Sequence, residues 1–162
     1  MTICPECGAE STPEMNCETV FNDCLAHEFV DPDFGEIHHL TIAAYMLQHS
    51  SRLSDLGWLA TRQLLREFLI EKKSPSQIKK QNKNIVDSGK RNWKIRSSDG
   101  LAFIDRRVWT KTILDINLYN SAYYRDTIIA WASTVLTDSE TISLSTHEGS
   151  SEYGTGTQHE FS

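Results

Sequence analysis

The N-terminal third of the chain contains three cysteines and a histidine, residue types that bind metal ions. Cys4 and Cys7 form the motif CPECG, Cys17 follows ten residues after Cys7, and His49 lies further along. In a reducing compartment, a CxxC pair is more typical of a metal or redox site than of a structural disulfide. The third cysteine, the histidine and the lack of a thioredoxin-like βαβ pattern favour a metal. Three thiolates and one imidazole suit zinc, which binds four such ligands in a tetrahedron at about 2.0–2.3 Å. We therefore predict a structural zinc ion bound by Cys4, Cys7, Cys17 and His49.

Residues 17–50 predict how these ligands come together, as two helices joined by the turn DPDFG. Each helix has one face whose residues are spaced i, i+4, i+7 and i+11, namely Cys17, Phe21, Cys24 and Glu28 on the first and His38, Ile42, Tyr45 and His49 on the second. A short turn makes the helices antiparallel neighbours, so the two faces match in reverse order. We expect the pairs Cys17 with His49, Phe21 with Tyr45, Cys24 with Ile42, and Glu28 with His38. The CPECG motif would meet the first pair at one end of the helices.

Two other residues compete for a place on the metal. Cys24 lies two helical turns, about 10 Å, from Cys17, so we expect it to be a small buried hydrophobic residue. His38 lies about three turns from His49, at the opposite end of the helix pair, and Glu28 is its more natural partner. His49 is the preferred fourth ligand, and the sequence leaves His38 open as the alternative.

Glu28, His38 and Tyr45 have two interpretations. A histidine beside a carboxylate is half of an acid/base site, because the carboxylate fixes the tautomer of a ring that titrates near neutral pH. The interpretation that we prefer is a polar contact that sets the register of the two helices. Tyr45 is then a packing residue or supports a metal ligand. The spacing does not decide between a functional pocket and a packing contact.

The whole sequence predicts a mainly α protein, a small helical bundle with an N-terminal zinc knuckle and one short β-hairpin. Besides the two helices above, the first at about 15–29, we expect helices at about 55–72, from Ser74-Pro75 onward with Gln77 completing the cap, at about 107–118, and at about 121–136. The hairpin is expected at about 93–104, around the turn residues Asp99-Gly100. Residues 1–136 would form one domain, and residues 137–162, rich in Ser, Thr, Gly and acids, a flexible tail.

The charge is unevenly distributed along the chain. The 162 residues carry a net charge of −6. Residues 61–96 contain eleven Lys or Arg against three acids, a net charge of +8, so the remainder carries −14. This basic stretch is either a solvated helix face, which we prefer, or a nucleic-acid contact. No apolar run reaches the ~20 residues of a membrane span and the N-terminus lacks the pattern of a signal peptide, so we expect a cytoplasmic protein that does not contact the membrane.

Several of these motifs together resemble a family of uncharacterised bacterial proteins, described as a domain of unknown function. The resemblance is carried by CPECG, NCETVF, LAHEFVDPDFG, IHHLTIAAYMLQHS and the distal WASTV at 131–135. The family pattern is CPxCG, a later Cys before an aromatic residue, EYxDP, HxLTVDAYxxQHP and WAxSV. This chain departs from it at Ala43, where the family often has Asp, and at Ser50, where it has Pro. The resemblance implies a metal-binding knuckle and a helical fold, and it implies no known activity.

Three functions follow from these observations. The first is a non-enzymatic interaction module, whose zinc holds the N-terminal arm and whose surface binds a protein partner of unknown identity; the lack of a recognised nucleophile or phosphate loop favours it. The second is a nucleic-acid-binding protein that uses residues 61–96. The third is a metal-dependent hydrolase, which requires His49 to leave a position on the zinc open for water. We predict no catalytic residue.

Overall fold

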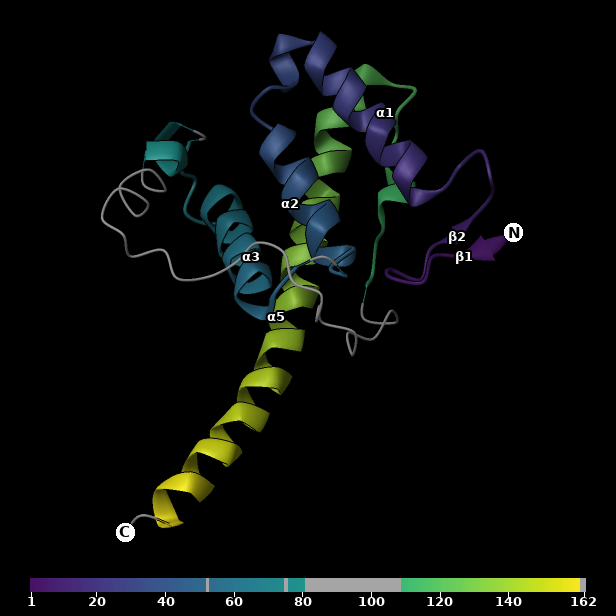
Figure 1. Cartoon of the computed structure of the whole chain (residues 1–162). Coiled ribbons are helices and arrows are strands. Elements are labelled where there is room, and N and C mark those ends of the chain that lie inside the picture. The colour runs from purple at the N-terminus through teal and green to yellow at the C-terminus, as the bar shows by residue number, and fades with distance from the viewer. Residues whose placement is uncertain (52, 75, 81–108, 161–162) are drawn as a thin grey trace.

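The protein is mainly α-helical, as predicted, in a computed structural model that describes residues 1–51, 53–74, 76–80 and 109–160 (Figure 1). Its helices are α1 (Cys17–Val30), α2 (His38–Gln48), α3 (Asp55–Leu69) and α5 (Ser121–Glu160), with short 3₁₀ turns η1 (Pro32–Phe34) and η3 (Ile113–Asp115). Residues 76–80 are also helical. The strands β1 (Thr2–Ile3) and β2 (Glu10–Ser11) form an antiparallel hairpin in which Thr2 pairs with Ser11 and Ile3 with Glu10. The helices pack into a bundle around one core.

Local signals explain where α1 begins and ends. Asn16 caps α1, because its side chain accepts from the amide of Thr19 at 3.0 Å and Thr19 Oγ1 accepts from the Asn16 amide at 3.0 Å. The residue before a proline avoids helical geometry, so α1 ends at Val30, before Asp31-Pro32. The turn η1 then reverses the chain into α2. The predicted antiparallel pair of helices is present (Figure 1).

The core lies where α2, α3 and α5 meet. One stripe of α5 is completely buried, with Tyr124, Ile128, Trp131 and Val135 all 0% exposed. Two indole nitrogens of this core are paired: Trp58 Nε1 donates to the Leu47 carbonyl at 3.2 Å, and Trp131 Nε1 donates to Gln48 Oε1 at 3.0 Å. The amide of Gln48 in turn donates to the Lys111 carbonyl at 2.6 Å. Gln48 therefore connects the end of α2 to α5 and also to the segment that precedes α5.

The helix predicted at 107–118 is wrong. Of the described part of this segment, 109–118, only η3 is helical. A capping box sets the start at residue 113, because Thr112 Oγ1 accepts from the Leu114 amide and Asp115 Oδ2 accepts from the Thr112 amide, and the backbone is already extended at Ile116. This turn places the Ile113 side chain in the core, where it is completely buried.

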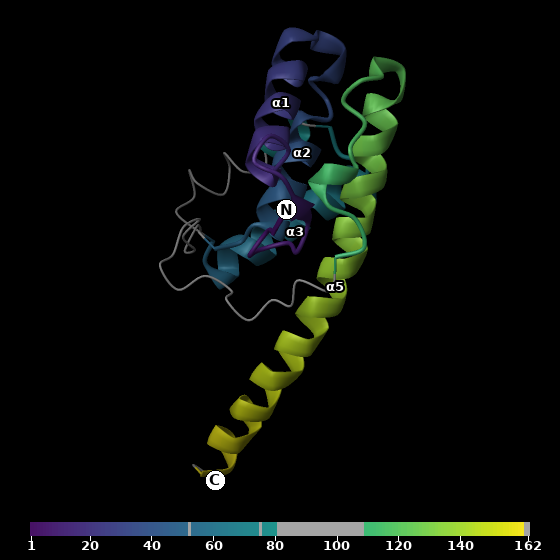
Figure 2. The same ribbon diagram turned by 90° about the vertical axis from the view of Figure 1, so that its right-hand side faces the viewer.

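The last helix continues beyond its predicted end at Leu136. α5 runs to Glu160 and its C-terminal half extends away from the other helices, into the stretch predicted as a flexible tail (Figures 1 and 2). The first residues of that stretch are packed on the bundle. Ser139 is buried, Asp138 accepts from the amide of Thr110 at 2.8 Å, and Arg66 forms an ion pair with Glu140. These side-chain contacts hold α5 against the rest of the bundle as far as Glu140.

Other predictions for the second half of the chain have mixed outcomes. The cap at Ser74 is confirmed, because Gln77 Oε1 accepts from the Ser74 amide at 2.8 Å and Ser74 Oγ accepts from the Gln77 amide at 3.2 Å. The hairpin predicted at about 93–104 lies outside the described residues; among the residues that are described, the hairpin is the one at the N-terminus. Over the described ranges, no helix is both long and apolar enough to cross a membrane.

Candidate metal centre

The N-terminal hairpin positions the first two cysteines. Cys4 and Cys7 lie in the loop between β1 and β2, where the Cys4 amide donates to the Ala9 carbonyl at 2.8 Å and the Gly8 amide donates to the Cys4 carbonyl at 3.0 Å. Gly8 has φ 81°, a left-handed conformation that favours glycine. This glycine therefore allows a tight turn after Cys7. The turn brings the Ala9 amide to the sulfur of Cys7 as a hydrogen-bond donor.

The helix pair positions the other two ligands. Cys17 is the first residue of α1, and His49 is the residue that caps the C-terminus of α2. The ligand atoms of Cys4, Cys7, Cys17 and His49 all lie within 4.8 Å of one another. The sulfurs of Cys7 and Cys17 are 3.5 Å apart, close to the ~3.8 Å expected for two sulfurs on one tetrahedral zinc with bonds of about 2.3 Å. The predicted convergence of these four residues is confirmed, and the cluster could hold a metal ion.

The hydrogen bond made by the His49 ring leaves one nitrogen, Nε2, available to bind a metal ion. Nδ1 lies 2.9 Å from the Tyr45 carbonyl oxygen, which can only accept, so Nδ1 carries the proton. Nε2 is therefore the nitrogen with a free lone pair. It is buried and has no hydrogen-bond partner among the described residues, which is costly for a polar atom unless a ligand satisfies it. A metal ion between Nε2 and the three sulfurs would satisfy it.

The thiols of Cys7 and Cys17 share a hydrogen bond that shifts the pKa of both. The pKa of Cys7 is lowered to about 4, mainly because the Cys17 thiol donates to its sulfur. The pKa of Cys17 is correspondingly raised, because its proton is held by Cys7 and because it is buried. Metal binding requires deprotonated thiols, and a cation would replace the proton that the two sulfurs share.

The pairing predicted along the two helices holds at three of its four positions. Cys17 lies with His49 in the cluster, the rings of Phe21 and Tyr45 stack with centroids 3.9 Å apart, and His38 Nδ1 lies 2.9 Å from Glu28 Oε1. The pair of Cys24 with Ile42 stays a prediction. Cys24 is not in the cluster: it is 0% exposed in the core, and burial raises the pKa of its thiol to about 11. His38 is likewise outside the cluster, bound to Glu28.

Glu28 is the centre of a second polar cluster, and two of its members were missed by sequence reasoning. Its Oε2 atom accepts from Thr41 Oγ1 at 2.5 Å and from the Tyr124 hydroxyl at 2.6 Å, while Oε1 faces His38. Thr41 follows His38 by three residues on the same helix face, which was a usable signal. Tyr124 is 96 residues from Glu28, and no local pattern predicts its contact. The Glu28 side chain is 0% exposed and enclosed by these donors, a geometry suited to joining α1, α2 and α5.

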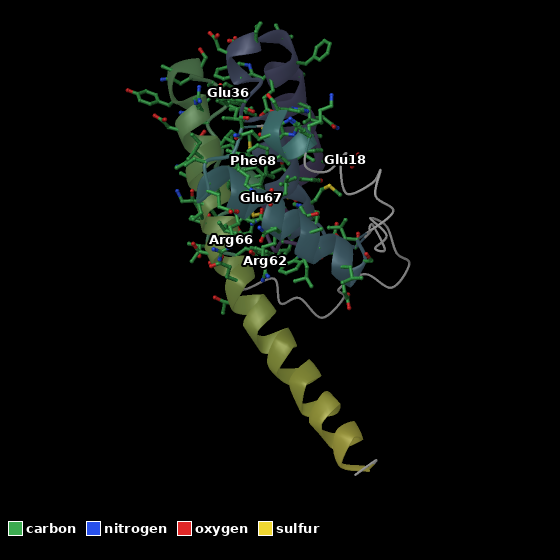
Figure 3. All side chains as sticks on the ribbon, turned by 90° about the vertical axis from the view of Figure 1, so that its left-hand side faces the viewer. Glu18, Glu36, Arg62, Arg66, Glu67 and Phe68 are labelled. Carbon is green, nitrogen blue, oxygen red and sulfur yellow. The ribbon has the colours of Figure 1, made fainter. Side chains whose placement is uncertain are left out.

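Two basic side chains within residues 61–96 form ion pairs with acidic side chains. Arg66 pairs with Glu140, and Lys73 Nζ lies 3.6 Å from Glu67 Oε1. Figure 3 shows Arg66 and Arg62 on α3, at the side where it approaches α5. The guanidinium of Arg62 lies over the ring of Trp58, 5.9 Å from its centroid. Residues 81–96, which hold five of the eleven basic residues, lie outside the described ranges.

The fold and the site together define a mainly helical protein with a three-cysteine, one-histidine cluster between an N-terminal hairpin and a helix pair. A family profile matches residues 2–140, so the chain belongs to DUF5946, a family of unknown function. The match ends at Glu140, the last residue of α5 whose side-chain contact with the bundle is described above. Comparison with curated proteins and with solved structures gave no match.

Proposed function

We propose that this protein binds one zinc ion through Cys4, Cys7, Cys17 and His49, and that the ion is structural. The observation that supports the proposal most is the buried, unpartnered Nε2 of His49 beside three sulfurs. Soft thiolates with one imidazole favour zinc over hard cations such as magnesium or calcium. Four protein ligands complete its tetrahedron and leave no position for a water molecule. A structural role therefore has better support than a hydrolytic one.

The ion would hold the N-terminal arm, residues 1–16, on the helix pair. Cys4 and Cys7 belong to the arm, whereas Cys17 and His49 belong to the helices, so zinc crosslinks the two parts. The cap bonds of Asn16 to Thr19 also join the arm to α1, and the Ser51 amide, just after α2, donates to Glu6 Oε1 at 2.9 Å. We propose that the zinc-bound arm and the adjoining helices form an interaction module for a protein partner in the cytoplasm.

Metal analysis of the purified chain tests the proposal. We expect one equivalent of zinc by mass spectrometry. If free zinc exceeds the dissociation constant a thousandfold, binding adds about 4 kcal/mol to the free energy of unfolding. For a chain of this length that corresponds to a melting temperature higher by about 8–16 °C, which a chelator should remove.

Matched variants separate ligands from neighbours. Cys17→Ser and His49→Ala should bind zinc much more weakly and lose it on purification, whereas Cys24→Ala and His39→Ala should keep it, since Cys24 and His39 lie outside the cluster. A zinc-free wild-type chain whose melting is insensitive to chelators contradicts the proposal. A wild-type chain with esterase or phosphatase activity that a folded Cys17→Ser or His49→Ala variant loses would favour the hydrolase instead.

Nucleic-acid binding through residues 61–96 is the second candidate, and the acids paired with Arg66 and Lys73 weaken it. Phosphate contacts would make affinity fall steeply with salt. A titration with random DNA and RNA at low salt is therefore the decisive measurement, and we expect no binding.

A further inference from the structure

We infer that Tyr45 is a positioning residue for the metal ligand His49, and that the aromatic stack of Phe21, Tyr45 and His49 aims the Nε2 atom at the three sulfurs. The inference rests on the proposed zinc site and adds to it a residue that binds no metal.

The ring of Tyr45 lies between two other rings. Its centroid is 4.1 Å from that of His49, with 19° between the planes, and 3.9 Å from that of Phe21, with 7° between the planes. Two rings cannot both stack at about 4 Å on the same face of a third without overlapping. Phe21 and His49 therefore lie on opposite faces of Tyr45. The stack runs from α1 through α2 to the metal ligand.

The backbone of Tyr45 fixes His49 as well. Its carbonyl accepts from the His49 amide at 2.9 Å and from His49 Nδ1 at 2.9 Å. The stack sets the plane of the imidazole, and the Nδ1 bond prevents the half-turn of the ring that would exchange Nδ1 and Nε2. Both torsions of the histidine side chain are thus held by one residue four positions earlier.

His49 needs this support because of its place in the chain. It follows the last residue of α2, with φ −125° and ψ 67°, so helical geometry does not constrain its side chain. Histidine ligands usually depend on a partner for the nitrogen that does not bind metal, and loss of such a partner costs about 10–100-fold in metal affinity. Here a backbone carbonyl is that partner, and the Tyr45 ring holds the imidazole against it.

The experiment compares zinc affinity, measured by competition with a chromophoric chelator, in Tyr45→Leu, Tyr45→Phe and Tyr123→Leu. We expect Tyr45→Leu to bind zinc about 10–100-fold more weakly. Tyr45→Phe retains the ring and should stay within about twofold of the wild type, as should the control Tyr123→Leu, whose tyrosine is exposed on α5. The cobalt-substituted Tyr45→Leu protein should show a shifted d–d absorption, because an imidazole that leaves the metal is replaced by water.

A double variant shows whether Tyr45 acts through His49. In the His49→Ala background, Tyr45→Leu should have no further effect on zinc affinity, because the ligand that it positions is absent. A merely structural role would instead lower the melting temperature without changing the affinity. If Tyr45→Leu does not fold, Tyr45→Met, which has high helix propensity and fills irregular space, takes its place.

The outcomes distinguish this inference from the proposed function. A wild-type chain that binds no zinc overturns both. A wild-type chain that binds zinc with the same affinity and cobalt spectrum as Tyr45→Leu overturns the role of Tyr45 alone. An equal loss of affinity in Tyr45→Phe and Tyr45→Leu also overturns it, because the hydroxyl rather than the ring would then be responsible.

Discussion

Removing the hydroxyl of Tyr124 tests whether the buried carboxylate of Glu28 joins the helices of the bundle. Tyr124 on α5 donates to Glu28 Oε2 at 2.6 Å, and the same oxygen accepts from Thr41 of α2. Tyr124→Phe deletes one oxygen atom and leaves the ring in contact with Phe34 and His27. The change therefore removes the hydrogen bond to Glu28 and leaves no space larger than one oxygen atom.

The expected loss follows from the charge of the acceptor. A hydrogen bond to a charged group contributes about 1.5–3 kcal/mol. Glu28 keeps Thr41 on the same oxygen and His38 on the other, so the loss should stay below the about 3–5 kcal/mol that accompany a buried charge stripped of its partner. We expect the free energy of unfolding to fall by about 2 kcal/mol, with a melting temperature lower by about 4–8 °C.

Urea unfolding of Tyr124→Phe and of Tyr123→Phe is the assay. The control makes the same chemical change one residue away, where the tyrosine is 59% exposed, and should stay within about 0.5 kcal/mol of the wild type. Thr41→Val removes the second donor to Oε2, and the double variant should lose at least about 0.5 kcal/mol more than the two single losses added together. Equal stability of Tyr124→Phe and the control, or strict additivity with Thr41→Val, would refute the reasoning.

Two more predictions concern the core thiol and the end of α5. Burial raises the pKa of Cys24 from 9.0 to about 11, so between those pH values the unfolded chain releases a proton that the folded chain keeps. The free energy of unfolding should therefore fall as pH rises from 9 to 11. In urea titrations at these two pH values, the fall should be smaller in Cys24→Ala than in the wild type by on the order of 2 kcal/mol. An equal fall in both proteins would contradict this. A chain ending at Thr141 keeps the contacts of Asp138 and Glu140, so its melting temperature should match that of the full chain, and a loss above about 1 kcal/mol would show that residues 142–162 stabilise the bundle.

The cluster of Cys17 and His49 could be predicted from residue spacing because its geometry is nearly local. Cys17 and His49 belong to two helices joined by a short turn, so a single reversal of the chain determines which side chains meet. The same argument placed Phe21 beside Tyr45 and Glu28 beside His38. It also excluded Cys24, because two helical turns separate it from Cys17.

The predicted helix at 107–118 fails for a reason that the chain already contains. Thr112 and Asp115 have the spacing of a capping box, and both cap the single turn of η3. Weighing that signal against the apolar residues around it would have shortened the prediction. For α5, the apolar stripe ends at Val135, and the helix continues through contacts with Arg66 and Thr110 that lie far away in the sequence.

Spacing along the chain thus specified the helix pair and its ligands, because residues a few turns apart have their separation set by helix geometry. It could not specify that Tyr124 completes the shell of Glu28, or that Gln48 receives the indole of Trp131. Those contacts depend on how deep α5 lies against α2 and on its rotation about its own axis. Both are set by the simultaneous packing of the whole core, which brings together residues far apart in the sequence.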